Sequence, residues 1–415
     1  MESESPAPEE LEEEWPETPT LEPQRIERRG AWVAVPTLRE EELGLVSRLL
    51  IVWVGSGAGI ISTYVYQSRP DLLLNNVNFW IDSNKFNLAD LYRTLLDKIR
   101  EEMEVGYRPV VPIGHFKRCF IKIGDKGAGK NPDRGFKMFQ RYSQSILHTL
   151  NWAFGKFNCE GAAVVFALGG GTGTKVGPFL AATLARWLKP TAEREGTAVL
   201  PICTLPLRAN PEDLENAIKG LEDIERYQSI SGEPSHKPLV LDLETIASQL
   251  KVRRLPEDVI YEKCDHLIAT LLGDLFTILQ NRRAAKPSWD WSDLYDLMAK
   301  APMGSLGTIM YVRYDELEQL ERGWRRDLPA SAALRGLILP EGSGTLFMIG
   351  AKITKQLHQN IQAFLRDKYQ IKRLLTPLLV LGNKYEILTL YWGISIRNIK
   401  PELKPIEAER RWGLF

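Results

Sequence analysis

The segment Leu168–Thr174 combines glycine and threonine in a pattern suited to holding a phosphate. Glycine stands at Gly169, Gly170, Gly171 and Gly173, and threonine at Thr172 and Thr174. Glycine allows successive backbone N–H groups to turn towards one anion, and the threonine hydroxyls add further donors. An apolar run, residues 162–168, precedes the segment, and a helical pattern follows from Pro178. A helix N-terminus would add its dipole, so the pattern predicts a phosphate-binding loop rather than a flexible turn.

A second glycine segment, Gly55-Ser56-Gly57-Ala58-Gly59, directly follows the apolar run Ile51–Val54. A loop at the carboxyl end of a strand can also face a phosphate. A dinucleotide-binding GxGxxG motif needs another glycine at the position of Ile60, which argues against that class of enzyme.

A third segment has two interpretations. Residues 124–130 spell GxxxxGK, the start of the P-loop motif, but Asn131 stands where a serine or threonine would hold Mg²⁺. Asn131 followed by Pro132 is typical of a helix start, with asparagine as the N-cap and proline in the first turn. A P-loop ATPase is therefore the alternative to another kind of phosphate loop, in which Lys130 supplies a point charge.

Together these motifs resemble those of the tubulin/FtsZ superfamily. Residues 169–175 match six of the seven positions of its signature, Gly-Gly-Gly-Thr-Gly-Thr/Ser-Gly, with Lys175 in place of the last glycine. Residues 127–135 match the third loop of FtsZ, Gly-Ala-Gly-x-Asn-Pro-x-x-Gly. Residues 55–59 resemble the first loop, although Ile60 departs from the asparagine of the family. The longer match at 127–135 favours this family over a P-loop protein.

The resemblance implies that the chain binds GTP or GDP together with Mg²⁺. Asp82 and Ser83 stand where the family has Asn and Thr, close to the phosphates or Mg²⁺, although an Asx turn is an alternative for that loop. The residues assigned to the nucleotide are Gly55, Ser56, Gly57, Asp82, Ser83, Gly127, Ala128, Gly129, Lys130, Asn131, Gly169, Gly170, Gly171, Thr172, Gly173, Thr174, Asn210, Glu212, Tyr261 and Asp265. No residue is assigned as a metal ligand.

The base and the ribose have their own candidates. Tyr261 and Asp265 lie four apart in a helical pattern and so share a face. The tyrosine ring can stack on a purine, and the carboxylate can accept hydrogen bonds from guanine N1 and N2; an ordinary charged helix surface is the alternative. FtsZ proteins carry an aspartate at the position of Asp265. The ribose loop of FtsZ is matched less well by Thr204–Glu212, since Asn210 falls opposite its glutamate and Glu212 follows two residues later.

Asp290 and Asp293 are the candidate catalytic residues. Residues 288–294, Ser-Trp-Asp-Trp-Ser-Asp-Leu, resemble the catalytic loop of FtsZ, Asn-x-Asp-Phe-Ala-Asp-Val, with Ser288 in place of asparagine. In the family this loop reaches the nucleotide of the next subunit, where the carboxylates orient the attacking water. Two carboxylates three residues apart are suited to polarising water beside a phosphate, or, without a partner, to starting a helix.

The pattern of the chain predicts an α/β fold with a mostly parallel sheet, a long central helix from Pro256 to about Gln280, and a smaller α+β part after it. One helix is expected over Phe136–Ala153. The expected divisions are a disordered acidic arm (1–29), a GTP-binding domain (30–255), the central helix (256–284), a catalytic loop with a C-terminal activation domain (285–400) and a tail (401–415).

The composition and charge of the chain indicate which partners and which cellular location to expect. Lysine plus arginine (53) equals aspartate plus glutamate (53), so no basic excess points to nucleic acid. Nine glutamates within residues 2–22 predict the disordered arm, which together with the basic C-terminal tail is a candidate for binding an adaptor. The four cysteines form no CxxC pair, and no apolar run suggests membrane insertion, so a cytoplasmic protein is expected.

The sequence therefore predicts an FtsZ-like GTPase whose subunits stack head to tail into filaments and hydrolyse GTP at their contacts. The alternatives are a GTP-binding scaffold of the same family with little hydrolysis, favoured by Ile60, Lys175 and Ser288, and a P-loop ATPase or dinucleotide enzyme, favoured only by the partial glycine motifs.

Overall fold

The computed structural model describes residues 47–188, 197–231, 237–282, 285, 287–350, 353–379 and 384–403. The predicted acidic arm and the part of the predicted tail beyond Leu403 lie outside these residues. Within the described ranges, no helix combines the length and the apolar character needed to cross a membrane.

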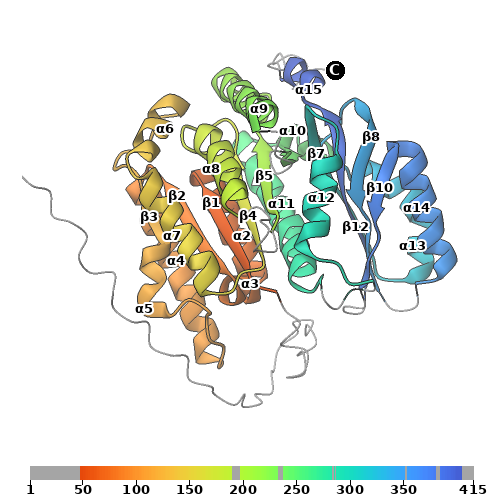
Figure 1. Cartoon of the computed structure of the whole chain (residues 1–415), viewed down its shortest axis with the longest axis horizontal. Helices are drawn as coiled ribbons and strands as arrows, with labels where there is room; N and C mark the ends of the chain where they lie inside the picture. Colours follow the sequence, from red (N-terminus) through yellow and green to blue (C-terminus); the bar gives the residue numbers. More distant parts are fainter. Residues whose placement is uncertain are drawn as a thin grey trace, which may run out of the picture. The chain divides into compact units, whose positions relative to one another are not determined.

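One sheet of twelve strands runs through the described chain (Figure 1). Its strands are β1 (Leu49–Val54), β2 (Val77–Asp82), β3 (Phe120–Lys122), β4 (Gly161–Ala167), β5 (Val199–Leu205), β6 (Leu239–Asp242), β7 (Ser305–Tyr314), β8 (Ile338–Thr345), β9 (Phe347–Ile349), β10 (Ile371–Leu375), β11 (Leu378–Leu379) and β12 (Tyr385–Ser395). Their order is β10-β8-β12-β7-β6-β5-β4-β1-β2-β3, with β9 pairing with β12 and β11. Strands β1 to β6 pair in parallel, whereas β12 is antiparallel to β7, β8 and β9.

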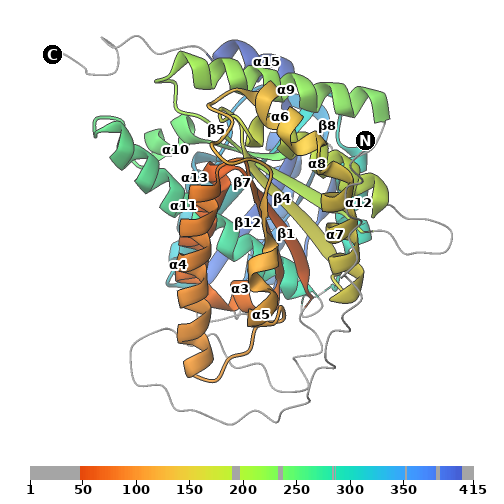
Figure 2. The same ribbon diagram turned by 90° about the vertical axis from the view of Figure 1, so that its left-hand side faces the viewer.

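Helices cover both faces of the sheet (Figure 2). They are α2 (Ser56–Ser68), α3 (Pro70–Asn75), α4 (Lys85–Glu104), α5 (Ile113–Phe116), α6 (Pro132–Gln140), α7 (Ser143–Lys156), α8 (Gly173–Trp187), α9 (Pro211–Ser231), α10 (Leu243–Gln249), α11 (Glu257–Gln280), α12 (Trp291–Lys300), α13 (Leu317–Ala330), α14 (Lys355–Tyr369) and α15 (Ile396–Glu402), with a 3-10 turn over Lys117–Cys119. Helices α2, α4 and α11 lie on one side, and α7 and α8 on the other. The central strands are consequently buried on both faces, as in other parallel sheets.

The predicted fold class is confirmed: a mostly parallel α/β sheet, a long central helix and a smaller part with antiparallel strands. The boundary between the two parts is crossed by the sheet itself, since β6 pairs in parallel with β7 at Leu239 and Gly307. Lys237 strengthens this junction. Its buried ammonium donates to the carbonyls of Met298 (2.7 Å) and Ala301 (2.6 Å), at the C-terminal end of α12.

The prediction of a single helix over Phe136–Ala153 is wrong. The structure has two helices, α6 and α7, separated at Arg141 and Tyr142. Their apolar residues follow one continuous helical pattern, but α6 packs against α8 whereas α7 packs against β1 and α8. Both helices contact α8, but only α7 also packs on β1, and this requires a change of direction that hydrophobic periodicity does not reveal.

The start of β4 is in close contact with the segment that leads into α12. Trp291 is 2% exposed, and a Cβ atom on Gly161 would lie 1.9 Å from its ring. Only glycine at the first position of β4 leaves room for this indole, so the close approach fixes α12 against the amino end of the strand.

We expect Gly161→Ala to lower the free energy of unfolding by about 3 kcal/mol, because the added methyl group would have to displace a buried indole. Urea denaturation measures this change. Gly155→Ala in α7 is the matched control: nothing lies within 4 Å of its added Cβ atom, so the variant should be unchanged or up to about 1 kcal/mol more stable. Equal denaturation midpoints for the two variants would contradict the packing argument.

Candidate nucleotide site

The glycine loop lies between the carboxyl end of β4 and the N-terminus of α8. Thr174 fixes its shape: the hydroxyl accepts from the N–H of Gly169 (3.0 Å) and donates to the carbonyl of Gly170 (2.6 Å). Among the described residues, the N–H groups of Gly170 and Gly171 have no hydrogen-bond partner. A Cβ on Gly170 would meet nothing within 4 Å, so there is open space beside this residue, just before the N-terminus of α8. This arrangement suits an anion.

Side chains at the ends of β1, β2 and β4 meet beside this loop. Ser56 donates to the Asp82 carboxylate (2.7 Å), and the hydroxyls of Ser83 and Thr172 lie 2.7 Å apart. Asp82 is 4% exposed and also accepts from the N–H of Asn84 at 3.2 Å. The structure thus brings together three segments that the sequence singles out separately.

The third segment packs directly on the glycine loop. Asn131 caps α6 by accepting from the N–H of Arg134 (2.9 Å), and Pro132 opens the helix, as predicted. A Cβ on Gly135 would lie 2.2 Å from the carbonyl oxygen of Gly171, so only glycine allows α6 to approach this closely. The last glycine of the nine-residue motif therefore has a packing role.

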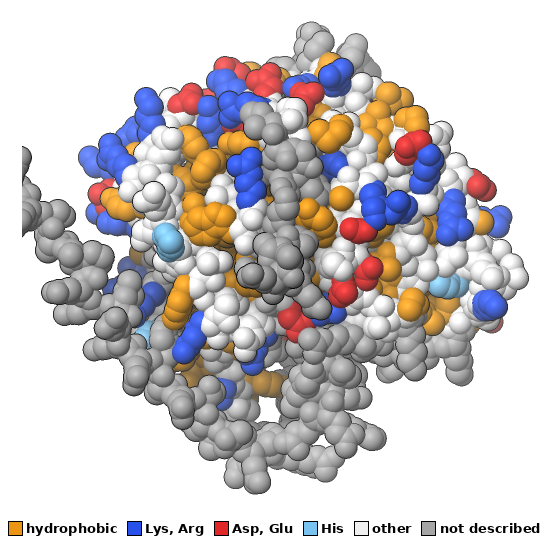
Figure 3. Space-filling view, viewed as in Figure 1, with side chains coloured by type: hydrophobic (Ala, Val, Ile, Leu, Met, Phe, Trp, Pro, Cys, Tyr) orange, Lys and Arg blue, Asp and Glu red, His pale blue; other side chains and the backbone are white. Residues whose placement is uncertain are grey.

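Two lysines beside the loop are paired with acids. The Lys130 ammonium lies 2.8 Å from Asp213 of α9, and that of Lys175 contacts Asp133 of α6. The hydrogen bond from Lys175 holds the pKa of Asp133 below its ordinary value. Lys and Arg side chains also gather over α6 in Figure 3. Arg134 and Lys137 of α6 and Arg141, directly after it, are exposed.

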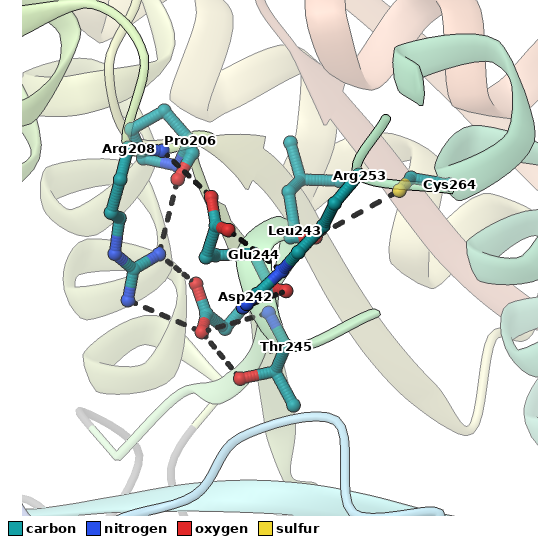
Figure 4. Close-up of polar contacts among 8 residues, drawn as sticks. All are labelled: Pro206, Arg208, Asp242, Leu243, Glu244, Thr245, Arg253 and Cys264. Atoms are coloured by element: carbon teal, nitrogen blue, oxygen red, sulfur yellow. Dashed lines mark hydrogen bonds and ion pairs between the residues drawn. The ribbon is translucent and has the colours of Figure 1, made fainter. Parts of the chain in front are cut away.

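An ion-pair network holds the loop between β5 and α9 (Figure 4). The buried Arg208 guanidinium contacts Asp242, at the end of β6, and donates to the carbonyl of Pro206 (3.2 Å). Glu244 accepts from the N–H of Arg208 (3.1 Å) and pairs with Arg253 at 3.0 Å. Charged residues buried this deeply require such pairing, so the network fixes the path of residues 206–208.

Helix α9 begins where the ribose contacts are predicted. Asn210 caps the helix, accepting from the N–H of Glu212 (3.0 Å), and Glu212 itself is exposed in the first turn. The side chains that face the phosphate loops lie about one and two helical turns after Asn210. They are Asp213, which pairs with Lys130, and Asn216, which donates to the carbonyls of Lys130 (2.7 Å) and Gly169 (3.1 Å).

Tyr261 and Asp265 lie on one face of α11, both partly buried. Burial raises the pKa of Tyr261, as do Asp213 and Glu257, while a hydrogen bond with the backbone of Leu207 opposes them. Tyr261 therefore adjoins the loop between β5 and α9. Burial raises the pKa of Asp265 to about 7. A carboxyl group poised near neutrality is common at binding and catalytic sites.

Asp290 and Asp293 form a reciprocal capping box at the start of α12. Asp290 accepts from the N–H groups of Ser292 (2.7 Å) and Asp293 (3.1 Å), and Asp293 accepts from the N–H of Asp290 (2.9 Å). Burial acts to raise the pKa of Asp290, but the hydrogen bonds from Ser292 and Asp293 outweigh it and hold the pKa below its ordinary value. Both side chains are exposed; Asp290 lies between the buried Trp289 and Trp291, and Asp293 follows two residues later.

The two groups of candidate residues lie at opposite ends of β4. The glycine loop follows its last residue, whereas Trp291 contacts Gly161, its first. Seven residues of strand span about 20 Å. The carboxylates of Asp290 and Asp293 therefore do not reach the glycine loop of their own subunit.

Comparison with known proteins identifies the fold. No protein-family model matches the chain. The tubulin-like protein CetZ of Pyrococcus abyssi is 24% identical over 273 residues, which are 62% of this chain and 68% of that protein. The GTPγS-bound protofilament structure of CetZ2 from Haloferax volcanii covers 86% of this chain and 95% of its own, with 15% identity and a TM-score of 0.63. The empty FtsZ dimer of M. jannaschii covers 86% and 93%, with 16% identity and a TM-score of 0.62.

The chain has the tubulin/FtsZ fold. The resemblance predicted from the motifs is confirmed at this level. The P-loop and dinucleotide interpretations lose their support, because both partial glycine motifs occupy loops of a tubulin/FtsZ sheet.

Four residues of this candidate site were not predicted from the sequence. Asp242 is the last residue of the buried strand β6 and Glu244 follows two residues later, and carboxylates at the end of a buried strand are a signal that could have found them. Asp213 and Asn216 carry no comparable signal, because only the orientation of α9 turns them towards the loops.

A cavity of about 290 Å³ adjoins the first loop. It lies between α2 and α4, with Trp53 and Trp80 among its lining residues, and reaches Ser56 and Asp82 at one end. No residue of the glycine loop lines it, so it is distinct from the space above Gly170.

Asp265→Asn should stabilise the nucleotide-free protein at alkaline pH. The folded-state pKa of Asp265 is raised, so its ionisation weakens the fold as pH rises from about 4 to about 7. Urea denaturation should show the variant more stable by about 1–3 kcal/mol at pH 8.5, with the difference vanishing below pH 4. Glu262→Gln, on an exposed side chain of the same helix, should show no such dependence. A gain independent of pH would contradict the assignment.

Proposed function

We propose that the chain binds GTP, assembles head to tail with copies of itself and hydrolyses GTP where two subunits meet. The observation that carries this proposal is the placement of unpaired donors of Gly170 and Gly171 at one end of β4 and two exposed carboxylates at the other. The fold supports it, since relatives with this fold include a GTPγS-bound protofilament. The cytoplasm is the proposed location, supported by four free, buried cysteines.

In this proposal the phosphates lie on the glycine loop and the base lies on α11. The loop would bind them through the N–H groups of Gly170 and Gly171, with Lys130 and the N-terminus of α8 adding positive charge. Tyr261 would stack on the base, and the Asp265 carboxylate would accept from guanine N1–H and N2–H. Adenine offers no such pair of donors.

Mg²⁺ would shield the charge of the phosphates. Asp82 is the carboxylate best placed for it, together with the hydroxyls of Ser83 and Thr172. No group of three or more His, Cys, Asp or Glu side chains suited to a metal occurs within the described ranges. This fits Mg²⁺, which is usually bound through one or two carboxylates and the phosphates.

Hydrolysis requires a water molecule to lose a proton beside the terminal phosphate. The exposed carboxylates of Asp290 and Asp293 can orient that water and accept its proton. Each of them uses one oxygen for capping, and the other oxygen of each has no hydrogen bond from a described residue. Because these groups lie about 20 Å from their own glycine loop, they would act on the nucleotide of a neighbouring subunit.

Nucleotide choice tests the role of Asp265. Calorimetry should show preference for GTP over ATP, with ITP intermediate because it lacks the 2-amino donor. Asp265→Ala should weaken GTP binding by about 1–3 kcal/mol. Binding of GTP should strengthen as pH rises through about 7, where the carboxylate ionises. Glu262→Ala is the control on the same helix. Equal affinity of the intact protein for ATP and GTP would refute the assignment.

Activity should depend on assembly. Phosphate release per subunit should rise above a threshold protein concentration. Asp290→Ser and Asp293→Gln preserve the cap of α12 but remove the carboxylates, so they should bind GTP normally and lose turnover. They should also give longer-lived polymers.

A mixing experiment separates the shared site from a site within one subunit. Gly170→Asp places a negative charge in the open space of the phosphate cradle and should prevent binding. Mixing it with Asp293→Gln should restore part of the turnover, because one variant holds GTP and the other supplies the carboxylates. Constant activity per subunit down to the monomer would overturn the proposal.

A GTP-binding scaffold with little hydrolysis is the second candidate. It is favoured by the capping hydrogen bonds that lower the pKa of Asp290, because a weaker base accepts a proton less readily. Sedimentable polymers that form with GTP but release no phosphate would identify this function.

A further inference from the structure

Lys130 and Asp213 form an ion pair that spans the glycine loop. The ammonium lies 2.8 Å from one carboxylate oxygen of Asp213 and 3.1 Å from the other. At one end of the loop, Gly171 packs against the segment that carries Lys130. At the other end, Gly169 packs against the backbone of Asp213 in α9. The pair therefore joins the two flanks of the phosphate cradle.

The backbone presents Lys130 in an unfavourable conformation. Its φ angle is 55°, in the left-handed region that residues other than glycine rarely adopt. Asn216 helps to hold it there by donating to the Lys130 carbonyl at 2.7 Å. Strain of this kind persists where surrounding structure imposes it, often at ligand sites. Here the strained residue carries the ammonium that pairs with Asp213.

The two residues of the pair differ in solvent exposure. The Asp213 side chain is 14% exposed, whereas that of Lys130 is 48% exposed. The lysine can therefore move while the carboxylate stays on the helix. Lys175, the other lysine beside the loop, pairs with Asp133 of α6, and its side chain is less exposed (25%) than that of Lys130.

We propose that the Lys130–Asp213 pair is a latch by which the site distinguishes nucleoside triphosphates from diphosphates. The terminal phosphate of a triphosphate takes Lys130 away from Asp213, whereas a diphosphate leaves the pair closed. This inference rests on the proposed binding of GTP. Asp213 then acts as a positioning residue that competes with the terminal phosphate for one ammonium group.

Opposite effects of the two residues follow from this competition. Asp213→Asn removes the competitor, so affinity for GTPγS should rise about fivefold while affinity for GDP stays the same. Lys130→Gln removes the ammonium for which Asp213 and the terminal phosphate compete, so the preference for GTPγS over GDP should fall. In the double variant, Asp213→Asn should have no further effect, because its gain requires Lys130.

The experiment is calorimetry of the full chain with GTPγS and with GDP, below the concentration at which it assembles. Glu215→Gln is the matched control: it removes an equal charge from α9, but Glu215 pairs with Lys219, 2.8 Å away, and not with Lys130. Its effect should be small and alike for the two nucleotides. Circular dichroism of each variant establishes that the fold is retained.

A fivefold gain specific to GTPγS in Asp213→Asn, lost in the Lys130→Gln background, would support the latch. Equal gains for GDP and GTPγS, or a gain that survives without Lys130, would overturn it while leaving GTP binding intact. Wild-type protein that binds neither nucleotide would remove the proposed function, and the latch with it.

Discussion

The close approach of backbone segments around the glycine loop is the constraint on which the rest of the site depends. Helix α6 can reach the loop only because Gly135 has no Cβ atom to meet the Gly171 carbonyl. Once α6 is seated, Lys130 lies beside the loop and Asn216 can bridge its carbonyl to that of Gly169. Three segments from different strands thus form one cradle, and its free N–H donors are left for a ligand.

The parallel sheet places all the segments of this cradle at one edge. Because neighbouring strands β1, β2, β4 and β5 run the same way, their following loops all gather at one edge. The chain returns to the other edge through α11, whose 24 residues span about 36 Å. That return places Asp290 and Asp293 at the amino end of β4. In the proposed function, one edge would bind the nucleotide and the other would supply the carboxylates, which is the geometry expected of subunits that complete one another in a heterologous stack.

Charge around the site is largely compensated within the chain. Arg208 with Asp242, Lys175 with Asp133 and Lys130 with Asp213 are ion pairs between segments far apart in sequence. Asp265 differs from these paired carboxylates, because burial raises its pKa to about 7. A ligand that donates hydrogen bonds to this carboxylate would replace the hydration that burial removes, which supports the proposed role of Asp265 in nucleotide selectivity.

The sequence by itself determined the local features. The glycine run, the Asn131–Pro132 helix start, strand β1 and the long helix α11 follow from residue type and spacing within one segment. The pairing of Asp290 with Asp293 is equally local, since a capping box needs only residues three apart.

The tertiary structure alone decided which distant segments meet. It broke the expected helix at Arg141, because α7 packs on β1 as well as on α8, whereas α6 packs on α8. It turned Asp213 and Asn216, rather than Glu212, towards the phosphate loops, and it buried Arg208 against Asp242. These contacts join residues 34 to 86 positions apart. Their geometry depends on how whole helices and strands pack, which residue type and local spacing do not encode.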